Sequence, residues 1–495
     1  MKHPSQMFIN GQFTGGQAAE SIAVINPATE EVLAEVPRGT AEDANAAVAA
    51  AKAAFPAWKR TPAWERAGLL HEAAAKMKAH EEELARLLTE EEGKPFVENE
   101  EEVFWTYDTF HYYAELGRHE RGRFIPPGDP DQINFVIKEP YGVAACITPW
   151  NYPLLLLAWK LAPALAAGNT VVIKPSEYTP LSTLRLVELA FDHFPPGVVN
   201  VITGYGPEAG EPLVLHPDVP LIAFTGSLAT GQRIASLAAP KMKKVHLELG
   251  GKDPFVLAPD VVEAIGMETA VSAVAYAGLI NAGQVCTSSE RIYVHESHFG
   301  QFSEELADFV GRLRLGNGLD PQTDIGPMIR SSFREKVEGQ IAGAIGAGAR
   351  LLVGGKRPSG MERGFFLEPA VLVNVNHDMP IMRDETFGPV LPIMPYKTFD
   401  EAIALANDTI YGLGASLMTG DARLVKRFYE DVKAGTIWIN DPLTDNFAGP
   451  FGGMKMTGGG RELGQQGLDE FYEVKHVHWD VEGKLKEYWY PYGRW

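Results

Sequence analysis

A cysteine near the middle of the chain offers a nucleophile. Cys286 lies in the segment Asn281–Thr287 (NAGQVCT), where an apolar helix is predicted to end in a loop of small and polar residues. A thiolate attacks electrophilic carbon, and small neighbours leave room for a substrate and for backbone N–H groups. A lone cysteine after an apolar helix is also a common core residue, so Cys286 alone does not establish catalysis.

A glutamate in an apolar strand offers a general base. Glu248 lies in Val245–Leu249, which runs into the pair Gly250-Gly251. An unpaired carboxylate among apolar residues has a raised pKa, which suits a group that gains and loses a proton near neutral pH. An edge strand whose glutamate faces water is the alternative, and this motif alone favours neither interpretation.

Together these two segments resemble the signature motifs of the NAD(P)-dependent aldehyde dehydrogenase superfamily. Further segments match family motifs in family order: Pro149-Trp150-Asn151-Tyr152-Pro153, Lys174-Pro175-Ser176-Glu177, Phe224-Thr225-Gly226-Ser227, Glu385-Thr386-Phe387-Gly388-Pro389, Pro450-Phe451-Gly452-Gly453 and Gly460-Arg461-Glu462-Leu463-Gly464. The resemblance covers nearly the whole chain, and so many ordered motifs do not coincide by chance. It implies NAD-dependent oxidation of an aldehyde to a carboxylic acid.

The resemblance also implies a role for each catalytic residue. Cys286 attacks the aldehyde carbon, and the side-chain amide of Asn151 with the backbone N–H of Cys286 holds the resulting oxyanion. After hydride transfer a thioester remains, and Glu248 activates the water that hydrolyses it. Lys160 and Glu462 match positions that orient Glu248 or relay its proton. An ordinary helix lysine and a surface ion paired with Arg461 are the alternatives for these two residues.

The cofactor implied by the resemblance is NAD. The residues assigned to its site are Trp150, Lys174, Glu177, Gly206, Gly226, Ser227, Leu249, Glu385 and Phe387. A carboxylate at Glu177 accepts hydrogen bonds from a ribose 2′-hydroxyl and repels a 2′-phosphate, so we expect a preference for NAD over NADP. The glycine segment Gly204–Gly210 follows the third predicted strand, whereas the common dinucleotide fingerprint follows the first. No metal site is predicted.

The substrate is predicted to be a small aldehyde in an apolar tunnel. Its predicted lining is Tyr152, Leu156, Trp159, Val285, Thr287 and Phe451. Such a wall favours aliphatic or aromatic aldehydes. Betaine aldehyde or an aminoaldehyde is the alternative, because aromatic faces bind ammonium groups and Asp441 or Asp445 adds charge, although betaine aldehyde enzymes typically carry tryptophan where this chain has Ile280 and Phe451.

Two alternatives belong to other functional classes. One is a thioester hydrolase or CoA-acylating relative, in which the thioester is resolved without water activated by Glu248. The other is a non-enzymatic structural relative that kept only the fold. The joint presence of Cys286, Glu248 and Asn151 argues against both.

Strands and helices alternate over the middle of the chain. At 495 residues the chain exceeds one hydrophobic core. Strands near 143–148, 170–173, 198–202, 220–224 and 244–249, with helices from near 154, 180, 207 and 227, predict a Rossmann-like parallel sheet and therefore an α/β fold. We predict a discontinuous NAD-binding domain at 1–121 and 141–249, a second α/β catalytic domain at 250–440, and a β oligomerisation arm and tail at 122–140 and 471–495.

Some local features are also predicted. Thr179 and Ser227 are expected to cap helices, and the helices between Ala41 and Glu92 are expected to break near Pro56 and Pro62. The aromatic residues between Phe104 and Tyr113 are predicted to pack in the core rather than to contact a ligand.

Composition limits the partners. The net charge of −20 disfavours nucleic acid and anionic membranes. No apolar run is long enough to span a bilayer, no signal segment is recognised, and the two cysteines argue for a reducing cytoplasm. The exposed arm and an aromatic tail predict a homo-oligomer, a dimer or tetramer.

Overall fold

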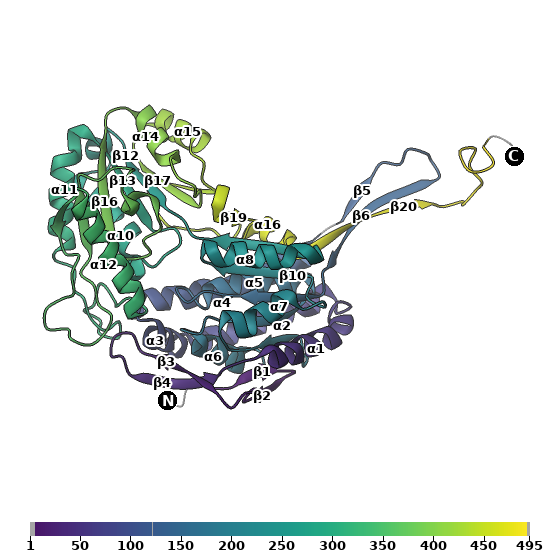
Figure 1. The fold of residues 1–495 in the computed structure, drawn as a ribbon. Helices are drawn as coiled ribbons and strands as arrows, with labels where there is room; N and C mark the ends of the chain where they lie inside the picture. Colours follow the sequence, from purple (N-terminus) through teal and green to yellow (C-terminus); the bar gives the residue numbers. More distant parts are fainter. Residues whose placement is uncertain (1–4, 121, 493–495) are drawn as a thin grey trace.

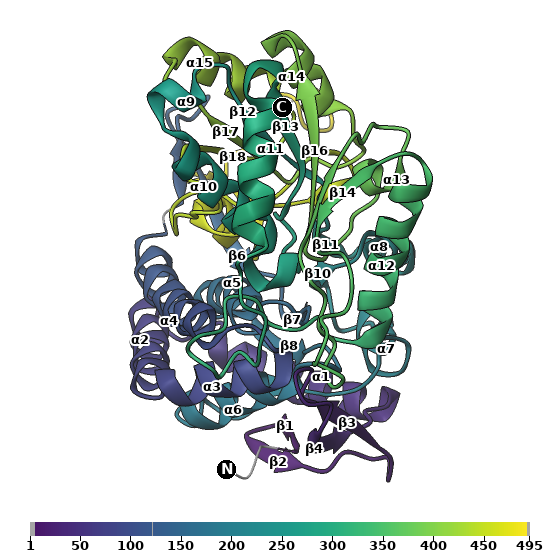
Figure 2. The ribbon, with the colours of Figure 1, turned by 90° about the vertical axis from the view of Figure 1, so that its left-hand side faces the viewer.

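Two lobes, each built on a mainly parallel sheet, and a long projecting arm make up the molecule (Figures 1 and 2). The computed structural model describes residues 5–120 and 122–492. No helix within these ranges is long and apolar enough to cross a membrane. The α/β architecture and the arm agree with the fold predicted from the sequence.

The first lobe contains an eight-stranded sheet in the order β19-β11-β10-β7-β8-β9-β1-β2. Its strands are β1 (Met7–Ile9), β2 (Gln12–Thr14), β7 (Val143–Ile147), β8 (Thr170–Lys174), β9 (Val199–Val201), β10 (Leu221–Gly226), β11 (Lys244–Leu249) and β19 (Gly458–Gly459). The five central strands are parallel and confirm the predicted alternation. Every residue of β7 and β8 is buried, as expected for strands covered on both faces.

Helices cover both faces of this sheet (Figure 1). They are α1 (Ala41–Trp58), α2 (Ala63–Ala79), α3 (Glu81–Glu92), α4 (Phe96–His119), α5 (Leu155–Ala167), α6 (Pro180–Ala190), α7 (Glu211–Leu215), α8 (Leu228–Ala238) and α16 (Gly464–Asp469). The helices break between Lys59 and Pro62, near the two prolines as predicted, although Pro56 itself lies inside α1, which continues to Trp58. Pro56 stands in the last turn of α1. It lacks the N–H for one helical hydrogen bond, and the helix ends two residues later.

The two predicted helix caps have different outcomes. Ser227 caps α8 as predicted, since its hydroxyl accepts a hydrogen bond from the Thr230 N–H at 3.3 Å. Thr179 stands at the N-cap of α6 with Pro180 directly after it, as predicted, but its hydroxyl makes no capping bond. The carboxylate of Glu91, at the end of α3, instead accepts the N–H groups of Leu181 and Ser182 at 2.8 and 2.9 Å. The two carboxylate oxygens each accept one N–H group at the start of the helix, where the backbone has unsatisfied donors.

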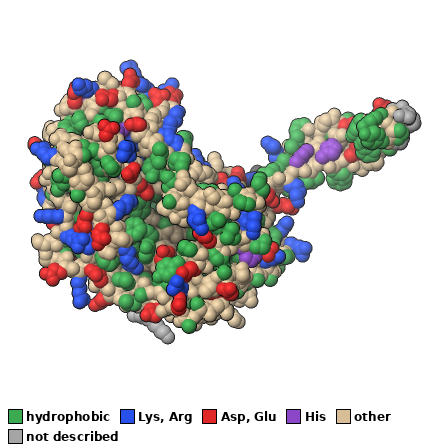
Figure 3. Space-filling view, viewed as in Figure 1, with side chains coloured by type: hydrophobic (Ala, Val, Ile, Leu, Met, Phe, Trp, Pro, Cys, Tyr) green, Lys and Arg blue, Asp and Glu red, His purple; other side chains and the backbone are tan. Residues whose placement is uncertain are grey.

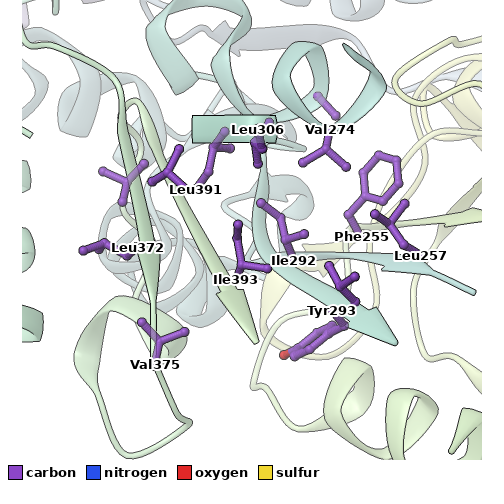
Figure 4. Close-up of a cluster of buried hydrophobic side chains, with 14 of the residues drawn as sticks. Phe255, Leu257, Val274, Ile292, Tyr293, Leu306, Leu372, Val375, Leu391 and Ile393 are labelled. Atoms are coloured by element: carbon purple, nitrogen blue, oxygen red, sulfur yellow. The ribbon is translucent and has the colours of Figure 1, made fainter. Parts of the chain in front are cut away.

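The second lobe contains a seven-stranded sheet in the order β14-β15-β16-β13-β12-β17-β18. Its strands are β12 (Asp253–Leu257), β13 (Ser289–His295), β14 (Arg350–Val353), β15 (Ala370–Val373), β16 (Val390–Tyr396), β17 (Gly414–Met418) and β18 (Thr436–Ile439). Its helices are α9 (Val261–Ala264), α10 (Met267–Leu279), α11 (Glu296–Val310), α12 (Ser331–Gly346), α13 (Pro380–Arg383), α14 (Phe399–Asn407) and α15 (Ala422–Asp431). Figure 4 shows Ile292 and Ile393 from neighbouring strands packing beneath Leu306 and Val274 of the covering helices. This core gives the catalytic loops a rigid support.

The arm is a three-stranded sheet of β5 (Arg123–Ile125), β6 (Gln132–Pro140) and β20 (Tyr472–Asp480). β20 pairs with β6 along its whole length, from Tyr472 opposite Pro140 to Asp480 opposite Gln132. Apolar side chains gather near the tip of the arm in Figure 3. Val474 and Tyr490 are 69% and 77% exposed. The predicted tail extends to residue 495, and residues 493–495 lie outside the described part of the chain.

A two-stranded sheet of β3 (Ser21–Ile25) and β4 (Val32–Pro37) lies at the base of the first lobe (Figure 2).

Candidate active site

A tight turn presents the cysteine. Cys286 follows α10 and a turn in which Asn281 and Ala282 both adopt left-handed backbone conformations, with φ of 49° and 52°. Gly283 continues the turn at φ 71°, and a Cβ there would lie 2.3 Å from the carbonyl oxygen of Gly388. Only glycine fits such a close approach. The turn leaves Cys286 partly exposed at the start of the loop that leads to β13.

Two cavities meet at this cysteine. The first has a volume of about 570 Å³ and is lined by both lobes, and the second has a volume of about 140 Å³. Their linings share Cys286 and no other residue of the described chain. A carbon atom bonded to the Cys286 sulfur is therefore reached from two separate sites.

The first cavity contains every residue that the sequence assigned to the cofactor: Trp150, Lys174, Glu177, Gly206, Gly226, Ser227, Leu249, Glu385 and Phe387. Seven of these follow or end parallel strands of the first sheet, at the carboxyl edge where open α/β sheets bind ligands. Glu385 and Phe387 come from the second lobe. The sequence did not identify further lining residues, including Thr230, Arg233, Phe333 and Lys336.

The chemistry of this cavity fits a dinucleotide. Ser227 places the N-terminus of α8 on the wall, where N–H groups favour a phosphate. A Cβ built on Gly206 would meet no protein atom within 4 Å, so the backbone there is open. Farther along the wall, the Lys174 ammonium lies 3.7 Å from the Glu177 carboxylate, a donor and an acceptor suited to ribose hydroxyls.

The loop that carries Glu385 is held from behind. Glu290 accepts the N–H groups of Thr386 and Phe387, both at 2.7 Å, and the Lys252 ammonium donates to Glu290 at 2.6 Å. Phe387 has a φ of 54°, a conformation that these bonds stabilise. Burial, with the charge of Glu290, raises the pKa of Glu385 to about 7.

The second cavity contains every residue predicted for the substrate tunnel: Tyr152, Leu156, Trp159, Val285, Thr287 and Phe451. Its remaining lining is Glu98, Glu101, Glu102, Trp105, Leu155, Tyr276, Ile280, Leu443, Thr444 and Asp445. Trp105 lines this cavity and also packs against Phe447, with ring centroids 4.4 Å apart. The packing prediction for the α4 aromatic residues is confirmed for Tyr107, Phe110 and Tyr113, which are core residues, and is wrong for Phe104, which is exposed. Asp445 lines the cavity and Asp441 does not, within the described structure.

The glutamates of α4 are the unexpected part of this lining. Glu98, Glu101 and Glu102 come from one face of α4, and Asp445 comes from the loop after β18. Burial raises the pKa of Glu98 to about 7 and that of Asp445 to about 7. A cation entering the cavity would favour their ionised forms.

Asn151 lies beside the cysteine loop. Its side chain is buried, and its amide donates to the carbonyl oxygen of Gln284 at 3.1 Å. An amide nitrogen carries two hydrogens, so this bond leaves the second available as a donor. Asn151 lines the same cavity wall as Cys286 and Glu248.

Glu248 is the penultimate residue of β11 and lies on the wall of the first cavity. Its side chain is buried, and neither carboxylate oxygen meets a donor in good hydrogen-bond geometry among the described residues. Burial, with the negative charge of Glu462, raises the pKa of Glu248 well above its ordinary value. Burial also raises the pKa of the Cys286 thiol, and Glu248 adds to that rise. The thiol form of Cys286 is therefore favoured over the thiolate at neutral pH in the absence of a ligand.

Lys160 and Glu462 lie behind Glu248. Both side chains are fully buried, and the Lys160 ammonium bonds to Glu462 and, at 2.5 Å, to the Thr225 hydroxyl. Thr225 stands opposite Glu248 on the neighbouring strand. A helix lysine at the surface and a glutamate paired with Arg461 are therefore both excluded.

Comparisons with known proteins agree with this arrangement. The pattern of the aldehyde dehydrogenase family matches residues 13–477. The betaine aldehyde dehydrogenase of Bacillus subtilis (strain 168) is 40% identical over 477 residues, which cover 95% of this chain and 96% of that protein. Peroxisomal aminoaldehyde dehydrogenase 2 of Pisum sativum is 40% identical over 485 residues, covering 95% of each.

A solved structure has the same fold. The crystal structure of betaine aldehyde dehydrogenase from Staphylococcus aureus in complex with NAD+ superposes with a TM-score of 0.96 at 39% identity, covering 99% of this chain and 97% of that one. Sequence, fold and site geometry lead to the same conclusion: the chain belongs to the aldehyde dehydrogenase family, oxidoreductases that act on the aldehyde group.

Proposed function

We propose that the chain oxidises a small cationic aldehyde to its carboxylic acid with NAD, through intermediates bound to Cys286. The observation that carries this proposal is the position of Cys286 as the residue shared by the two cavities. The smaller cavity delivers the aldehyde to the sulfur, and the larger one holds the hydride acceptor on the other side of the same carbon.

The first step forms a carbon–sulfur bond. The Cys286 thiolate attacks the aldehyde carbon, and the carbonyl oxygen becomes an alkoxide. The free amide hydrogen of Asn151 and the backbone N–H of Cys286 stabilise that charge, and one such donor contributes about 3 kcal/mol. An amide suits this role because it donates without titrating.

The second step removes a hydride from the thiohemiacetal carbon. NAD, when bound in the larger cavity by the residues around Lys174, Glu177 and Ser227 and by Glu385, supplies the acceptor for these two electrons. The alkoxide collapses to a carbonyl, and a thioester remains on Cys286. Glu290 accepts the N–H groups of Thr386 and Phe387 and so fixes the loop that places Glu385 and Phe387 on the wall of this cavity.

The third step hydrolyses the thioester. Glu248 takes a proton from water, the hydroxide adds to the thioester carbon, and the Cys286 thiolate leaves with release of the acid. The raised pKa of Glu248 suits a base that holds this proton and then returns it. Lys160 and Glu462, which adjoin Glu248 through Thr225, are proposed to pass the proton on.

The substrate class is inferred from the smaller cavity. Aromatic side chains form its walls, as expected for neutral aliphatic or aromatic aldehydes, but Glu98, Glu101 and Asp445 add negative charge. Cations bind aromatic faces and carboxylates together. The two relatives described above, from Bacillus subtilis and Pisum sativum, are named for betaine aldehyde and aminoaldehydes, which supports the cationic alternative over the neutral one.

Three further properties belong to the same proposal. Glu177 supports a preference for NAD over NADP. The exposed apolar side chains of the arm and tail support assembly of several copies into a homo-oligomer. A cytoplasmic location remains a prediction from composition.

An isosteric pair of substrates tests the substrate class. Betaine aldehyde and 3,3-dimethylbutanal have nearly the same shape. They differ in one atom, which is a positively charged nitrogen in the first and a neutral carbon in the second. We expect kcat/KM at least about tenfold higher for betaine aldehyde, equivalent to about 1.4 kcal/mol. The preference should shrink in Asp445→Asn, and all NADH formation should vanish in Cys286→Ala. Equal or better turnover of the neutral isostere would refute the cationic assignment and leave the aldehyde oxidation intact.

A further inference from the structure

A buried lysine that lines neither cavity in the described structure holds the oxyanion site together. Lys94 lies between α3 and α4, and its side chain is completely buried. Its ammonium bonds to the Glu102 carboxylate, lies 3.3 Å from Glu92 and donates to the carbonyl oxygen of Asn151 at 3.3 Å. It also stands 3.7 Å from the centre of the Tyr152 ring.

One carboxylate extends this contact to the helix behind Asn151. Glu102 accepts the N–H groups of Leu154 and Leu155 at 2.9 and 3.2 Å. These residues begin α5 directly after the Asn151 segment. Lys94 and Glu102 therefore fix both the carbonyl of Asn151 and the start of the helix that follows it.

The other carboxylate extends it to the cysteine loop. Glu92 accepts from the side-chain amide of Asn281 at 2.7 Å, and the same amide donates to the Asn151 carbonyl at 3.0 Å. Asn281 is the left-handed residue that begins the turn before Cys286. The Asn151 amide in turn donates to Gln284, two residues before Cys286. The segments that supply the two oxyanion donors thus meet around one ammonium group.

Lys94 supplies the positive charge that the two buried carboxylates of this cluster share. Burial opposes the charge of Lys94, but Glu102 and Glu92 raise its pKa above the ordinary value, so the ammonium persists. Its removal would leave Glu92 and Glu102 buried without the cation that both contact, so their side chains would move apart. That movement displaces the groups that hold Asn151 and Asn281.

We propose that Lys94 is a positioning residue that sets the oxyanion site by fixing Asn151 against the Cys286 loop. This inference rests on the proposed function and adds a residue to it. A misplacement of about 1 Å costs on the order of 10²-fold in rate, so partial loss of the Asn151 position should slow thiohemiacetal formation by about 10- to 100-fold.

The test is a double-mutant cycle on the first turnover. Lys94→Met, Asn151→Ala and the double variant are mixed with aldehyde at saturating NAD, and the rate of the first NADH formed per Cys286 is measured. Lys94→Met should lower this rate by at least tenfold, with little change in the Kd for NAD. In the Asn151→Ala background the same substitution should lower it by less than threefold, because the group that Lys94 positions is already absent.

Controls separate this role from general stability. Glu91→Gln removes a neighbouring buried carboxylate that caps α6, and it should lower Tm without slowing the first turnover. If Lys94→Met does not fold, Lys94→Arg, which keeps the charge and moves the donors, enters the same cycle. An equal loss in both backgrounds, or no loss in the wild-type background, overturns the inference. A wild-type protein that forms no NADH from any aldehyde would instead refute the proposed function.

Discussion

Removal of the Glu177 carboxylate should change which dinucleotide the protein uses. The Glu177 side chain is 25% exposed on the wall of the larger cavity, with its carboxylate 3.7 Å from the Lys174 ammonium, which is almost fully buried. A 2′-phosphate carries about −1.5 to −2 charges at pH 7. Placed near this pair, it is repelled by Glu177 and attracted by Lys174, so the two effects largely cancel while the glutamate is present.

Glu177→Gln leaves Lys174 as the local charge. Two unit charges 4 Å apart interact by about 4 kcal/mol near a protein surface, and exposure to water reduces this. We therefore expect about 1–3 kcal/mol of gain for NADP, or about 5- to 150-fold in its kcat/KM. For NAD we expect a loss of about 1 kcal/mol, because a charge-assisted hydrogen bond becomes a neutral one.

Steady-state kinetics with both cofactors measure this change. The ratio of kcat/KM for NAD over NADP is compared between the wild type, Glu177→Gln and Glu188→Gln. The last variant removes the same charge from α6 at a residue that does not line the cofactor cavity. The Glu188 variant should keep the wild-type ratio. A wild-type preference for NADP, or an unchanged ratio in Glu177→Gln, would show that the assignment of Glu177 to the ribose is wrong.

Other substitutions test the remaining parts of the mechanism. Glu248→Gln should form one NADH per Cys286 at a near-normal rate and then lose about 10²- to 10⁴-fold in turnover, since thioester hydrolysis needs the base; unchanged turnover would assign the base elsewhere. Burial and Glu248 raise the pKa of Cys286, so the rate of alkylation by iodoacetamide without NAD should increase as pH rises from 7 to 9. In Glu248→Gln the pH profile of this rate should lie at lower pH. A pH-independent rate would contradict a protonated thiol. Truncation after Asp480 removes the exposed aromatic tail and should lower the oligomeric mass or Tm in light scattering and calorimetry; no change in either would place the subunit contact elsewhere.

Regular features of the first lobe were predictable because their patterns are local. The five parallel strands and the N-cap Ser227 follow from apolar runs and a single hydroxyl before a helix. The group that caps α6 was not predictable, because Glu91 comes from a helix about 90 positions earlier in the chain. Sequence spacing carries no information about which distant side chain reaches a helix end first.

The smaller cavity shows the same limit. Its motif residues were found, but Glu98, Glu102 and Trp105 lie on α4, far from any motif. Their spacing of four and then three positions marks a single face of a helix, a signal that was present in the sequence. Acidic residues in a helix ordinarily face water, so only the fold distinguishes this face from a solvated one. Lys94 likewise resembles a linker residue until its burial is known.

The single residue shared by the two cavities has a consequence for inhibition. A compound that fills only the smaller cavity leaves the larger one open, so it should compete with the aldehyde and not with NAD. The converse holds for compounds shaped like adenosine. A molecule that joins both fragments must pass directly over the Cys286 sulfur, where an electrophilic group in its linker would be captured. Such a compound would obtain selectivity from the acidic wall and lifetime from the covalent bond.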